Sequence, residues 1–356
     1  MRILHIAPYN TAGVPLALCL AERELGHDSR LVTLGRGGRG YPEDICLNLP
    51  FWSPGLLAKA KKLCYSRKAL VQSTRRVLPH QIPPVWRPAN ALAALLINIR
   101  DRLALPVVGR AIERHRLDSF DYYQLDGGHG FLRNDRHLSK WHQQGKRMAC
   151  CYLGSDLRRR GVIPEIDAIA DCNLTVEWDH LDLHPRISHV FFPFDGSGLG
   201  PTRPPDRGPV RIGHSPTNRA AKGSEAIIQA IGQLSKRLPV ELVLIENLPH
   251  RQALELKATC HIGVDQLGEL GYGISALEWL AMGIPVASSI AGGMKSAGIE
   301  HPLLEVSQDD IEQKLEVLVV DRELRLRLGA RGREWIKEYH HPQRVVGTIH
   351  RLAGLA

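Results

Sequence analysis

The sequence predicts an α/β protein built from two doubly wound domains. Three observations lead to this prediction. Each half of the 356-residue chain opens on a short apolar strand, each strand is followed by a loop and an amphipathic helical run, and a Pro/Gly-rich segment separates the halves. Strands that alternate with helices form a parallel sheet, which binds ligands at the carboxyl ends of its strands.

The N-terminal domain is expected over residues 1–195. RILHIA at 2–7 is a short apolar strand, and VPLALCLAERELG at 14–26 is a helix with Pro15 in its first turn and Gly26 at its end. The further elements follow in order: strand SRLVTL (29–34), a helix from Ala89 to His115, and strands FDYYQL (120–125), RMACCYL (147–153) and NLTV (173–176).

A linker at 196–209, GSGLGPTRPPDRGP, leads to a C-terminal domain expected over 210–340. Its elements follow in order: strand VRIGHSP (210–216), helix SEAIIQAIGQLSKRL (224–238), strand VELVLIE (240–246), helix PHRQALELKAT (249–259), strand CHIGVDQL (260–267), and helices 308–320 and 321–340. Two such domains would form a cleft suited to a small ligand.

Composition and cysteine usage predict a folded protein in a reducing compartment. The chain is 44% hydrophobic and 23% charged, and no apolar run approaches the roughly 18 residues needed to span a bilayer. The N-terminus has a strand pattern rather than that of a signal peptide, so we expect a cytoplasmic protein. The seven cysteines are scattered and never spaced as CxxC, which argues against structural zinc.

The net charge of +9 allows nucleic acid, an anionic membrane surface or an acidic small substrate as partner. Residues 51–88 contain apolar side chains beside a run of cations without an acid, so this segment is either an amphipathic membrane contact or a solvated basic face. The cations are Lys59, Lys61, Lys62, Arg67, Lys68, Arg75, Arg76 and Arg87. Nucleic acid is the least expected partner because no recognised binding module is present.

The stretch LGELGYGISALEWLAMGIPVASS, residues 267–289, indicates a phosphate-binding helix terminus. Gly271 and Gly273 let the backbone turn, which places Tyr272 and Gly273 at the start of a helix, where free N–H groups bind phosphate oxygens. Glu278 follows about one turn later. Its carboxylate suits the hydroxyls of a ribose, although it could equally complement the helix dipole on a solvated face.

Two cations follow the first strand of the C-terminal domain. Arg219 and Lys222, in TNRAAKG at 217–223, are expected at the carboxyl edge of the sheet. There they fit a diphosphate, Arg219 through its two-pronged guanidinium and Lys222 as a point charge.

These features together resemble the donor domain of GT-B glycosyltransferases, specifically glycosyltransferase family 4. The resemblance covers roughly residues 205–345, and the residues that carry it are Arg219, Lys222, Gly271, Gly273, Glu278 and GIPV at 283–286. The N-terminal half resembles the acceptor domain more loosely, through NTAGV after the first strand and GSDLRRRG after a later one. The resemblance implies the GT-B fold, two Rossmann-like domains facing each other across a cleft.

The resemblance also implies an activity: transfer of a sugar from a nucleoside diphosphate sugar to an acceptor hydroxyl, with retention of configuration and without a metal or other cofactor. Arg219 and Lys222 would stabilise the leaving diphosphate, and Glu278 would hold the ribose. Gly13 would bring the first loop close to the donor phosphate or the acceptor. The last helix, 341–356, would pack back on the N-terminal domain.

Three residues of the N-terminal half are candidates for the reacting sugar and the acceptor. His129, in GGHG, lies where the family often has a histidine near the reacting sugar, but it could also be a surface loop residue. Asp126 in DGG and Asp156 in GSD are candidates for acceptor hydroxyls, although loops also favour Asp and Gly for turn geometry.

One departure from the family pattern concerns the donor sugar. The family has a glutamate eight positions before the one matched by Glu278, and here that position holds Leu270, with Glu269 beside it. Asp265 and Gln266 could supply the polar contacts to the sugar instead, or they could form a strand-end turn.

Other functions remain open on the sequence. A nucleotide-sugar epimerase shares the two-domain architecture, and Leu270 makes a non-catalytic nucleotide-binding protein conceivable. A dehydrogenase is not supported because no GxGxxG follows either opening strand. The acceptor is expected to be a carbohydrate or lipid-linked molecule. The basic segment fits a lipid-linked or membrane-borne acceptor, as in polysaccharide or glycolipid assembly, and a peripheral location on the inner face of a membrane.

Overall fold

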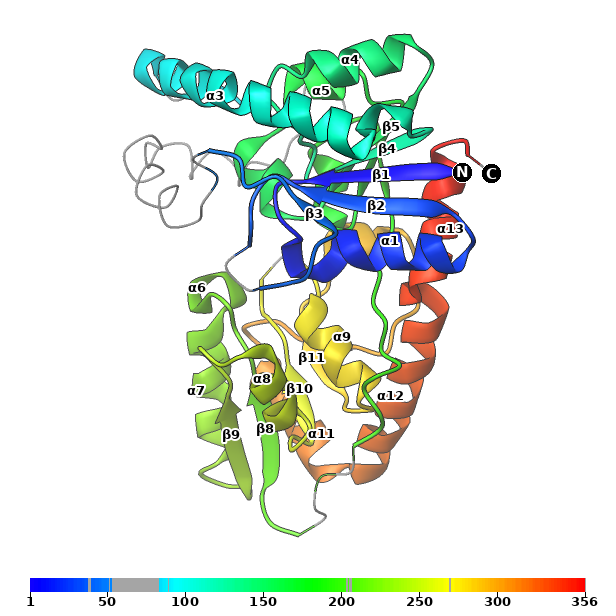
Figure 1. Cartoon of the computed structure of the whole chain (residues 1–356). Coiled ribbons are helices and arrows are strands. Elements are labelled where there is room, and N and C mark those ends of the chain that lie inside the picture. Colours follow the sequence, from blue (N-terminus) through cyan, green and yellow to red (C-terminus); the bar gives the residue numbers. More distant parts are fainter. Residues whose placement is uncertain are drawn as a thin grey trace. The chain divides into compact units, whose positions relative to one another are not determined.

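The computed structural model describes residues 1–37, 40–50, 52, 83–88, 90–202, 204, 207–268 and 270–355. The chain divides into two compact units, Met1–Pro193 with Pro342–Ala356, and Phe194–His341 (Figure 1). The division therefore falls just before the expected linker. Most of the basic segment, residues 53–82, and also Glu269 lie outside the described residues.

The first unit contains a parallel sheet of seven strands in the order β3-β2-β1-β4-β5-β6-β7. The strands are β1 (Arg2–Ala7), β2 (Asp28–Thr33), β3 (Ile45–Cys46), β4 (Tyr122–Asp126), β5 (Arg147–Tyr152), β6 (Cys172–Thr175) and β7 (Ile187–His189). The chain fills one side of β1 first and then returns to its other side with β4. The order therefore reverses between β1 and β4, which is where open α/β sheets bind ligands.

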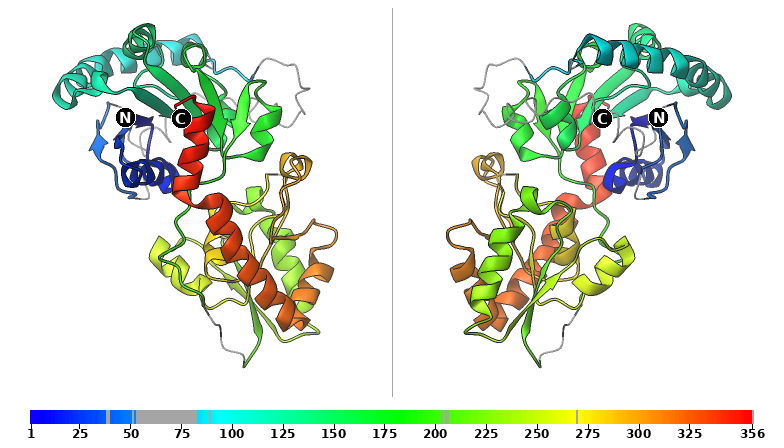
Figure 2. Two further views of the ribbon diagram at one scale, coloured as in Figure 1. Left: turned by 90° about the vertical axis from the view of Figure 1, so that its right-hand side faces the viewer. Right: turned by 90° about the vertical axis from the view of Figure 1, so that its left-hand side faces the viewer.

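Helices cover both faces of this sheet. The longer ones are α1 (Val14–Glu24), α3 (Ala91–His115), α4 (Arg136–Gln143) and α13 (Pro342–Leu352); shorter helical turns are α5 (Pro164–Asp167), η1 (Thr11–Gly13), η4 (Leu117–Ser119), η5 (Asp156–Arg160) and η6 (Trp178–Asp182). Figure 2 shows α13 packed against α1, which it crosses, and the side chain of Gln343 in α13 donates to Glu24 in α1 at 2.9 Å. Residues 342–356 thus belong to the first unit.

The core of the first unit joins the sheet to α3 and α4. Leu4 and Ile6 of β1 pack in one cluster with Val108 of α3 and Trp141 of α4. Both helices begin at side-chain caps, because Asn90 accepts a hydrogen bond from the Ala93 N–H and the side chain of the residue before α4 caps it likewise.

The second unit contains a parallel sheet of five strands in the order β12-β11-β10-β8-β9. The strands are β8 (Val210–His214), β9 (Val240–Leu244), β10 (Ile262–Val264), β11 (Val286–Ser288) and β12 (Leu304–Glu305). Here the order reverses between β8 and β10. Ligands are therefore expected beyond the carboxyl ends of these two strands.

The helices of the second unit are α6 (Arg219–Lys222), α7 (Ser224–Leu234), α8 (His250–Lys257), α9 (Ile274–Ala281), α10 (Gly292–Ser296), α11 (Ile311–Val320), α12 (Arg322–Trp335) and the short η7 (Ile336–His340). One core cluster contains Ile212 of β8, Ile227 and Ile231 of α7, and Leu315 and Leu318 of α11. The expected loop NRAAKG thus contains one short helix, α6, which Asn218 caps by accepting from the Ala221 N–H.

Trp279 positions α9 against the sheet. A Cβ atom at Gly213 of β8 would lie 2.9 Å from the indole ring, and one at Gly263 of β10 would lie 2.4 Å from it. Only glycine at both positions lets the buried indole lie directly on the two strands. This packing holds α9 beside the point where the strand order reverses.

Candidate functional site

The carboxyl edge of the second sheet gathers the residues predicted to bind the donor. Arg219 and Lys222 follow β8, and Asp265 follows β10, the neighbouring strand. His214 at the end of β8 bonds through Nδ1 to the Val264 carbonyl of β10 at 2.9 Å, which ties the two strand ends together. We use the term donor edge for Arg219, Lys222, Asp265, Gly273 and Glu278.

Asp265 joins two of the predicted phosphate ligands. The Nζ of Lys222 donates to Oδ1 of Asp265 at 2.8 Å, and the N–H of Gly273 donates to Oδ2 at 2.7 Å. The Asp265 side chain is fully buried, whereas that of Lys222 keeps 18% of its surface exposed. Asp265 therefore positions the lysine and the start of α9, a structural task that the sequence did not indicate.

Arg219 lies on the surface and is held by acids. Its guanidinium donates to both carboxylate oxygens of Glu246, at 2.8 and 2.7 Å, and to Glu225 at 3.4 Å. The hydrogen bonds from Arg219 lower the pKa of Glu246, so both partners are charged at neutral pH. A diphosphate bound by Arg219 would compete with these carboxylates for the guanidinium.

Glu278 is buried in α9 and is not on a solvated face. The buried Lys257 ammonium donates to Oε2 of Glu278. It also donates to the Ser275 hydroxyl at 2.7 Å. His250 approaches the other carboxylate oxygen, Oε1, at 2.7 Å. Burial alone would raise the pKa of Glu278, but the hydrogen bond from His250 and the charge of Lys257 lower it. The carboxylate is therefore ionised and held in a fixed orientation.

The remaining donor candidates lie just before α9 and just after β10. The Tyr272 side chain is buried, with its hydroxyl 3.1 Å from Nε2 of His340, so it points into the unit. Gly271 has a φ of +79°, the conformation that the predicted turn requires. Gln266 is buried beside Asp265, and its carbonyl accepts from the Ser289 N–H at 2.8 Å.

In the first unit, Gly13 and His129 follow β1 and β4, the two strands between which the order reverses. Gly13 has a φ of +77° and directly precedes α1. His129 is buried, and its Nδ1 lies 2.6 Å from the Gly130 carbonyl, so Nδ1 carries a proton and Nε2 is an acceptor. Burial and the charge of Arg160 lower the pKa of His129 to about 3. His129 is therefore neutral at physiological pH.

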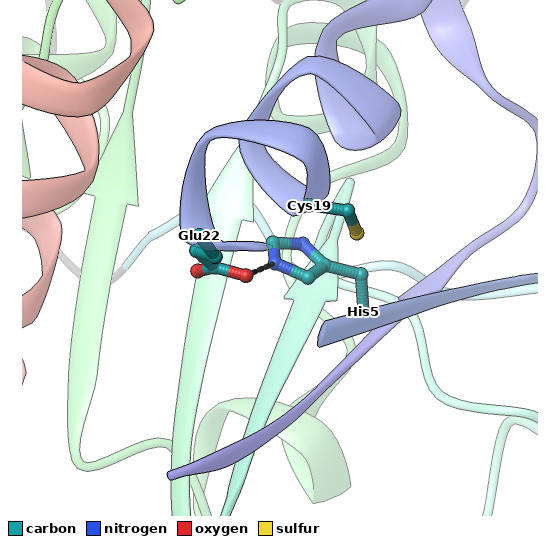
Figure 3. Close-up of side chains that lie close together, drawn as sticks. All are labelled: His5, Cys19 and Glu22. Atoms are coloured by element: carbon teal, nitrogen blue, oxygen red, sulfur yellow. Dashed lines mark hydrogen bonds and ion pairs between the residues drawn. The ribbon is translucent and has the colours of Figure 1, made fainter. Parts of the chain in front are cut away.

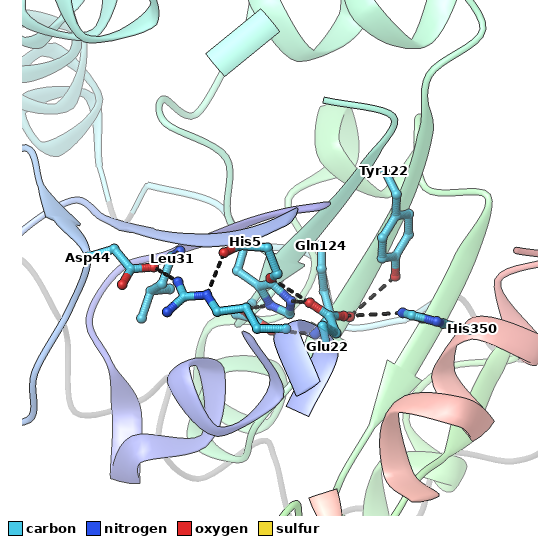
Figure 4. Close-up of polar contacts among 10 residues, drawn as sticks. His5, Glu22, Leu31, Asp44, Tyr122, Gln124 and His350 are labelled. Atoms are coloured by element: carbon cyan, nitrogen blue, oxygen red, sulfur yellow. Dashed lines mark hydrogen bonds and ion pairs between the residues drawn. The ribbon is translucent and has the colours of Figure 1, made fainter. Parts of the chain in front are cut away.

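Asp126 is fully buried, and it bonds to His5 and Gln124 of the polar network that Figure 4 shows. Its carboxylate accepts from His5 Nδ1 at 2.9 Å and from the Gln124 amide at 2.9 Å. Glu22 of α1 binds the other ring nitrogen of His5 at 3.0 Å and also contacts His350 of α13 at 3.3 Å. This placement favours a structural role for Asp126 over the expected contact with an acceptor hydroxyl.

Figure 3 shows His5, Cys19 and Glu22. The side-chain atoms with which these three residues could bind a metal ion lie within 4.8 Å of one another. Both ring nitrogens of His5 already face carboxylates. Burial alone would lower the pKa of His5, but the Cys19 thiol and the two carboxylates raise it well above its ordinary value. A protonated His5 between two carboxylates accounts for the geometry of this cluster.

Asp156 holds its own loop together. Its carboxylate accepts hydrogen bonds from the N–H groups of Leu153 at 2.8 Å, Gly154 at 2.9 Å and Leu157 at 2.7 Å. This arrangement fits the turn that Asp and Gly were equally expected to form. The adjacent Arg160 donates to the Gly127 carbonyl at 2.6 Å and thereby shapes the loop that carries His129.

The two parallel sheets define an α/β protein with the fold of the GT-B glycosyltransferases, which confirms the predicted fold class. No protein-family model and no curated protein matches the sequence. Solved structures match over the whole chain. HepE of Anabaena in complex with UDP and glucose has a TM-score of 0.56 at 11% identity and covers 100% of both chains.

Two further solved structures match in the same way. Sucrose-phosphate synthase of Thermosynechococcus elongatus has a TM-score of 0.60 at 14% identity, with 99% of this chain and 98% of that chain covered. A glycosyltransferase from Rickettsia africae has a TM-score of 0.55 at 12% identity, with 99% and 97% covered. At these identities the likeness concerns the fold, and family 4 within it stays a resemblance of sequence motifs.

Proposed function

We propose that the chain is a glycosyltransferase that moves a sugar from a nucleoside diphosphate sugar to an acceptor hydroxyl. The observation that carries the proposal is the convergence of Lys222 and the start of α9 at the carboxyl edge of the second sheet, where the strand order reverses. Arg219 adds a second cation, which like Lys222 follows β8. The similarity of the fold to HepE, solved with UDP and glucose, supports a nucleotide-sugar donor.

Each donor-edge residue has a task in this proposal. Arg219 and Lys222 neutralise the diphosphate and stabilise it as it leaves the sugar. Negative charge develops on the diphosphate in the transition state, and cations held in place stabilise it. Glu278 accepts hydrogen bonds from the ribose hydroxyls through the oxygen that faces the exposed His250. Asp265 keeps Lys222 in place, and Gln266 contacts the sugar where the family uses the glutamate that Leu270 replaces.

The first unit is proposed to bind the acceptor. The neutral Nε2 of His129 can accept a hydrogen bond from the acceptor hydroxyl, and Gly13 allows close approach of the backbone. The transfer is proposed to retain the anomeric configuration and to need no metal, because Arg219 and Lys222 supply the positive charge. A carbohydrate or lipid-linked acceptor in polysaccharide or glycolipid assembly fits the basic composition of residues 51–88.

Incubation with UDP-, GDP- and ADP-sugars tests the proposal. We expect release of the nucleoside diphosphate from one donor class, undiminished by EDTA and faster when an acceptor is added. Glu278→Gln should slow release strongly, and His129→Ala should slow transfer while nucleotide affinity is retained. Failure to release any nucleoside diphosphate would contradict the proposal.

The same assay separates the two alternatives. An epimerase would convert the donor sugar without an acceptor, and a non-catalytic protein would bind nucleotide without turning over the sugar donor. The non-catalytic alternative draws on Leu270, which removes a carboxylate that the family uses to contact the sugar. Product analysis of the retained or changed sugar therefore decides among the three functions.

A further inference from the structure

Helix α3 carries an exposed apolar stripe along its amino-terminal half. Five large aliphatic side chains recur at helical spacing, and each is between 44% and 62% exposed: Leu92, Leu95, Leu96, Ile99 and Leu103. Their spacings of three, four and seven residues place them on one face of the helix. In Figure 1 this half of α3 projects past the strands of its sheet.

The stripe faces away from the side of α3 that packs on the core. The buried residues of the helix include Ala93, Ala104 and Val108, and the last two belong to the core cluster of the first unit. At about 100° per residue, the directions of these three residues centre roughly 125° around the helix from those of Leu92, Ile99 and Leu103. The stripe is therefore not part of the core, and contiguous exposed apolar surface of this kind marks an interaction site.

Cations continue the stripe toward the end of the helix. Arg110 and Arg114 lie on the same face as Leu92 and Leu103, and Arg102 lies beside it; all three are exposed. Of the two acids of the helix, Asp101 points elsewhere and is paired with Arg100, at a closest distance of 2.5 Å, whereas the exposed Glu113 lies near this face, so three arginines stand against one acid. Two copies of this surface would bring like charges together, whereas an acidic lipid surface complements them.

We propose that the stripe of α3 docks the protein on an anionic lipid bilayer, with the leucines in the interface and the arginines at the headgroups. The stripe is about 16 Å long from Leu92 to Leu103, which suits a helix lying in the plane of the interface. Among the described helices, none has the length and apolar character needed to cross a bilayer. The proposal is independent of the proposed transferase activity.

Vesicle flotation tests the docking. The wild-type chain should float with phosphatidylcholine vesicles that contain phosphatidylglycerol, and less with phosphatidylcholine alone. The affinity of the variant Leu95→Gln/Ile99→Gln/Leu103→Gln for anionic vesicles should be at least roughly tenfold lower, because the apolar contribution to binding is lost. The matched control Val317→Gln/Val320→Gln/Leu326→Gln changes equally exposed residues of the second unit and should bind as wild type.

Charge and fold are checked separately. Arg110→Glu/Arg114→Glu should weaken binding to anionic vesicles, and added salt should do the same to the wild type. Hydrogen exchange of wild-type residues 91–106 should slow when vesicles are added, a measurement that needs no variant.

Three results would overturn the proposal. In the first, the wild type does not bind anionic vesicles. In the second, the leucine variant binds them undiminished, which would place the contact elsewhere, for example at the cations of 59–76. In the third, the stripe mediates a concentration-dependent dimer that the leucine variant abolishes.

Discussion

Lys222 and Asp265 form an ion pair of 2.8 Å at the carboxyl edge of the second sheet, with the carboxylate fully buried. The second oxygen of Asp265 accepts the Gly273 N–H at 2.7 Å. Two donors that the sequence predicts for phosphate therefore converge on one protein carboxylate. A diphosphate that binds here must share these donors with Asp265 or displace it, so this acid sets the geometry of the site.

Replacement of Asp265 by asparagine should weaken both nucleotide binding and folding. Asparagine offers one acceptor oxygen in place of two, so either Lys222 or Gly273 loses its partner. We expect at least about tenfold weaker binding of the nucleoside diphosphate and a loss of about 1–3 kcal/mol in unfolding free energy. Calorimetric titration and urea unfolding measure the two effects.

Asp310→Asn is the matched control for that variant. Asp310 pairs with Lys314 at 2.8 Å in the same unit, but both side chains are partly exposed and an exposed pair of this kind adds little. It should leave nucleotide affinity and stability near wild type. Equal behaviour of Asp265→Asn and Asp310→Asn would contradict the positioning role of Asp265.

Arg219→Ala should reduce affinity for the nucleoside diphosphate by about 10- to 100-fold, because a charge-assisted hydrogen bond to phosphate is lost. Arg237→Ala is its control, since Arg237 has the same 46% exposed side chain in the same unit and is likewise paired with two glutamates. Titration of both variants with one nucleotide compares them directly. A similar loss in Arg237→Ala would point to a general charge effect.

Lys257→Met should destabilise the second unit strongly. The ammonium is buried with Glu278 and lies 4.5 Å over the ring of Trp279, so its removal leaves a carboxylate without its buried cation. We expect a loss of about 3–5 kcal/mol in urea unfolding. The double variant Lys257→Met/Glu278→Leu should recover much of it, because no unpaired charge remains. Equal instability of the single and double variants would exclude a paired role.

The His5–Glu22 pair should give the first unit a stability maximum in mildly acidic solution. Burial alone would raise the pKa of Glu22, but His5 and His350 lower it from 4.5 to about 2, so its contribution is present above pH 4.5 and is lost as the pH falls toward 2. The pKa of His5 is raised above 6.5, so its contribution is complete below pH 6.5 and is lost as the pH rises through the folded-state value.

The contribution of this pair to the unfolding free energy should therefore be largest between about pH 4.5 and 6.5. Unfolding measured from pH 3 to pH 9 tests this. His5→Gln should be less stable and should flatten the decline on the alkaline side. An unchanged pH profile in His5→Gln would show that the pair does not titrate as described.

The strands and the donor edge could be predicted because their signals are local. β1, α1, β8 and α7 each combine a hydrophobic period with a boundary residue, and GYG marks a turn by composition alone. The partners of Glu278 could not be predicted, since nothing in PHRQALELKAT distinguishes Lys257 as a buried lysine. Its environment arises only when Trp279 lies on the strands at Gly213 and Gly263.

Short edge strands and long-range networks could not be predicted from the sequence, because neither leaves a local pattern. β3 and β12 contain two residues each, too few for any periodicity to show. The burial of Asp126 depends on His5 of β1, 121 positions away, and on Glu22 of α1. Asp126 in DGG has the composition of a loop residue, and only the folded sheet turns it inward.

If Arg219 and Lys222 form a nucleotide site, the binding of nucleoside diphosphates can be measured directly. UDP, GDP and ADP are titrated calorimetrically into the wild type and into Arg219→Ala/Lys222→Ala. We expect one of the three to bind the wild type at a single site per chain and to bind the double variant at least about 100-fold more weakly. Absence of binding to the wild type by all three, or equal affinity in the double variant, would contradict this expectation.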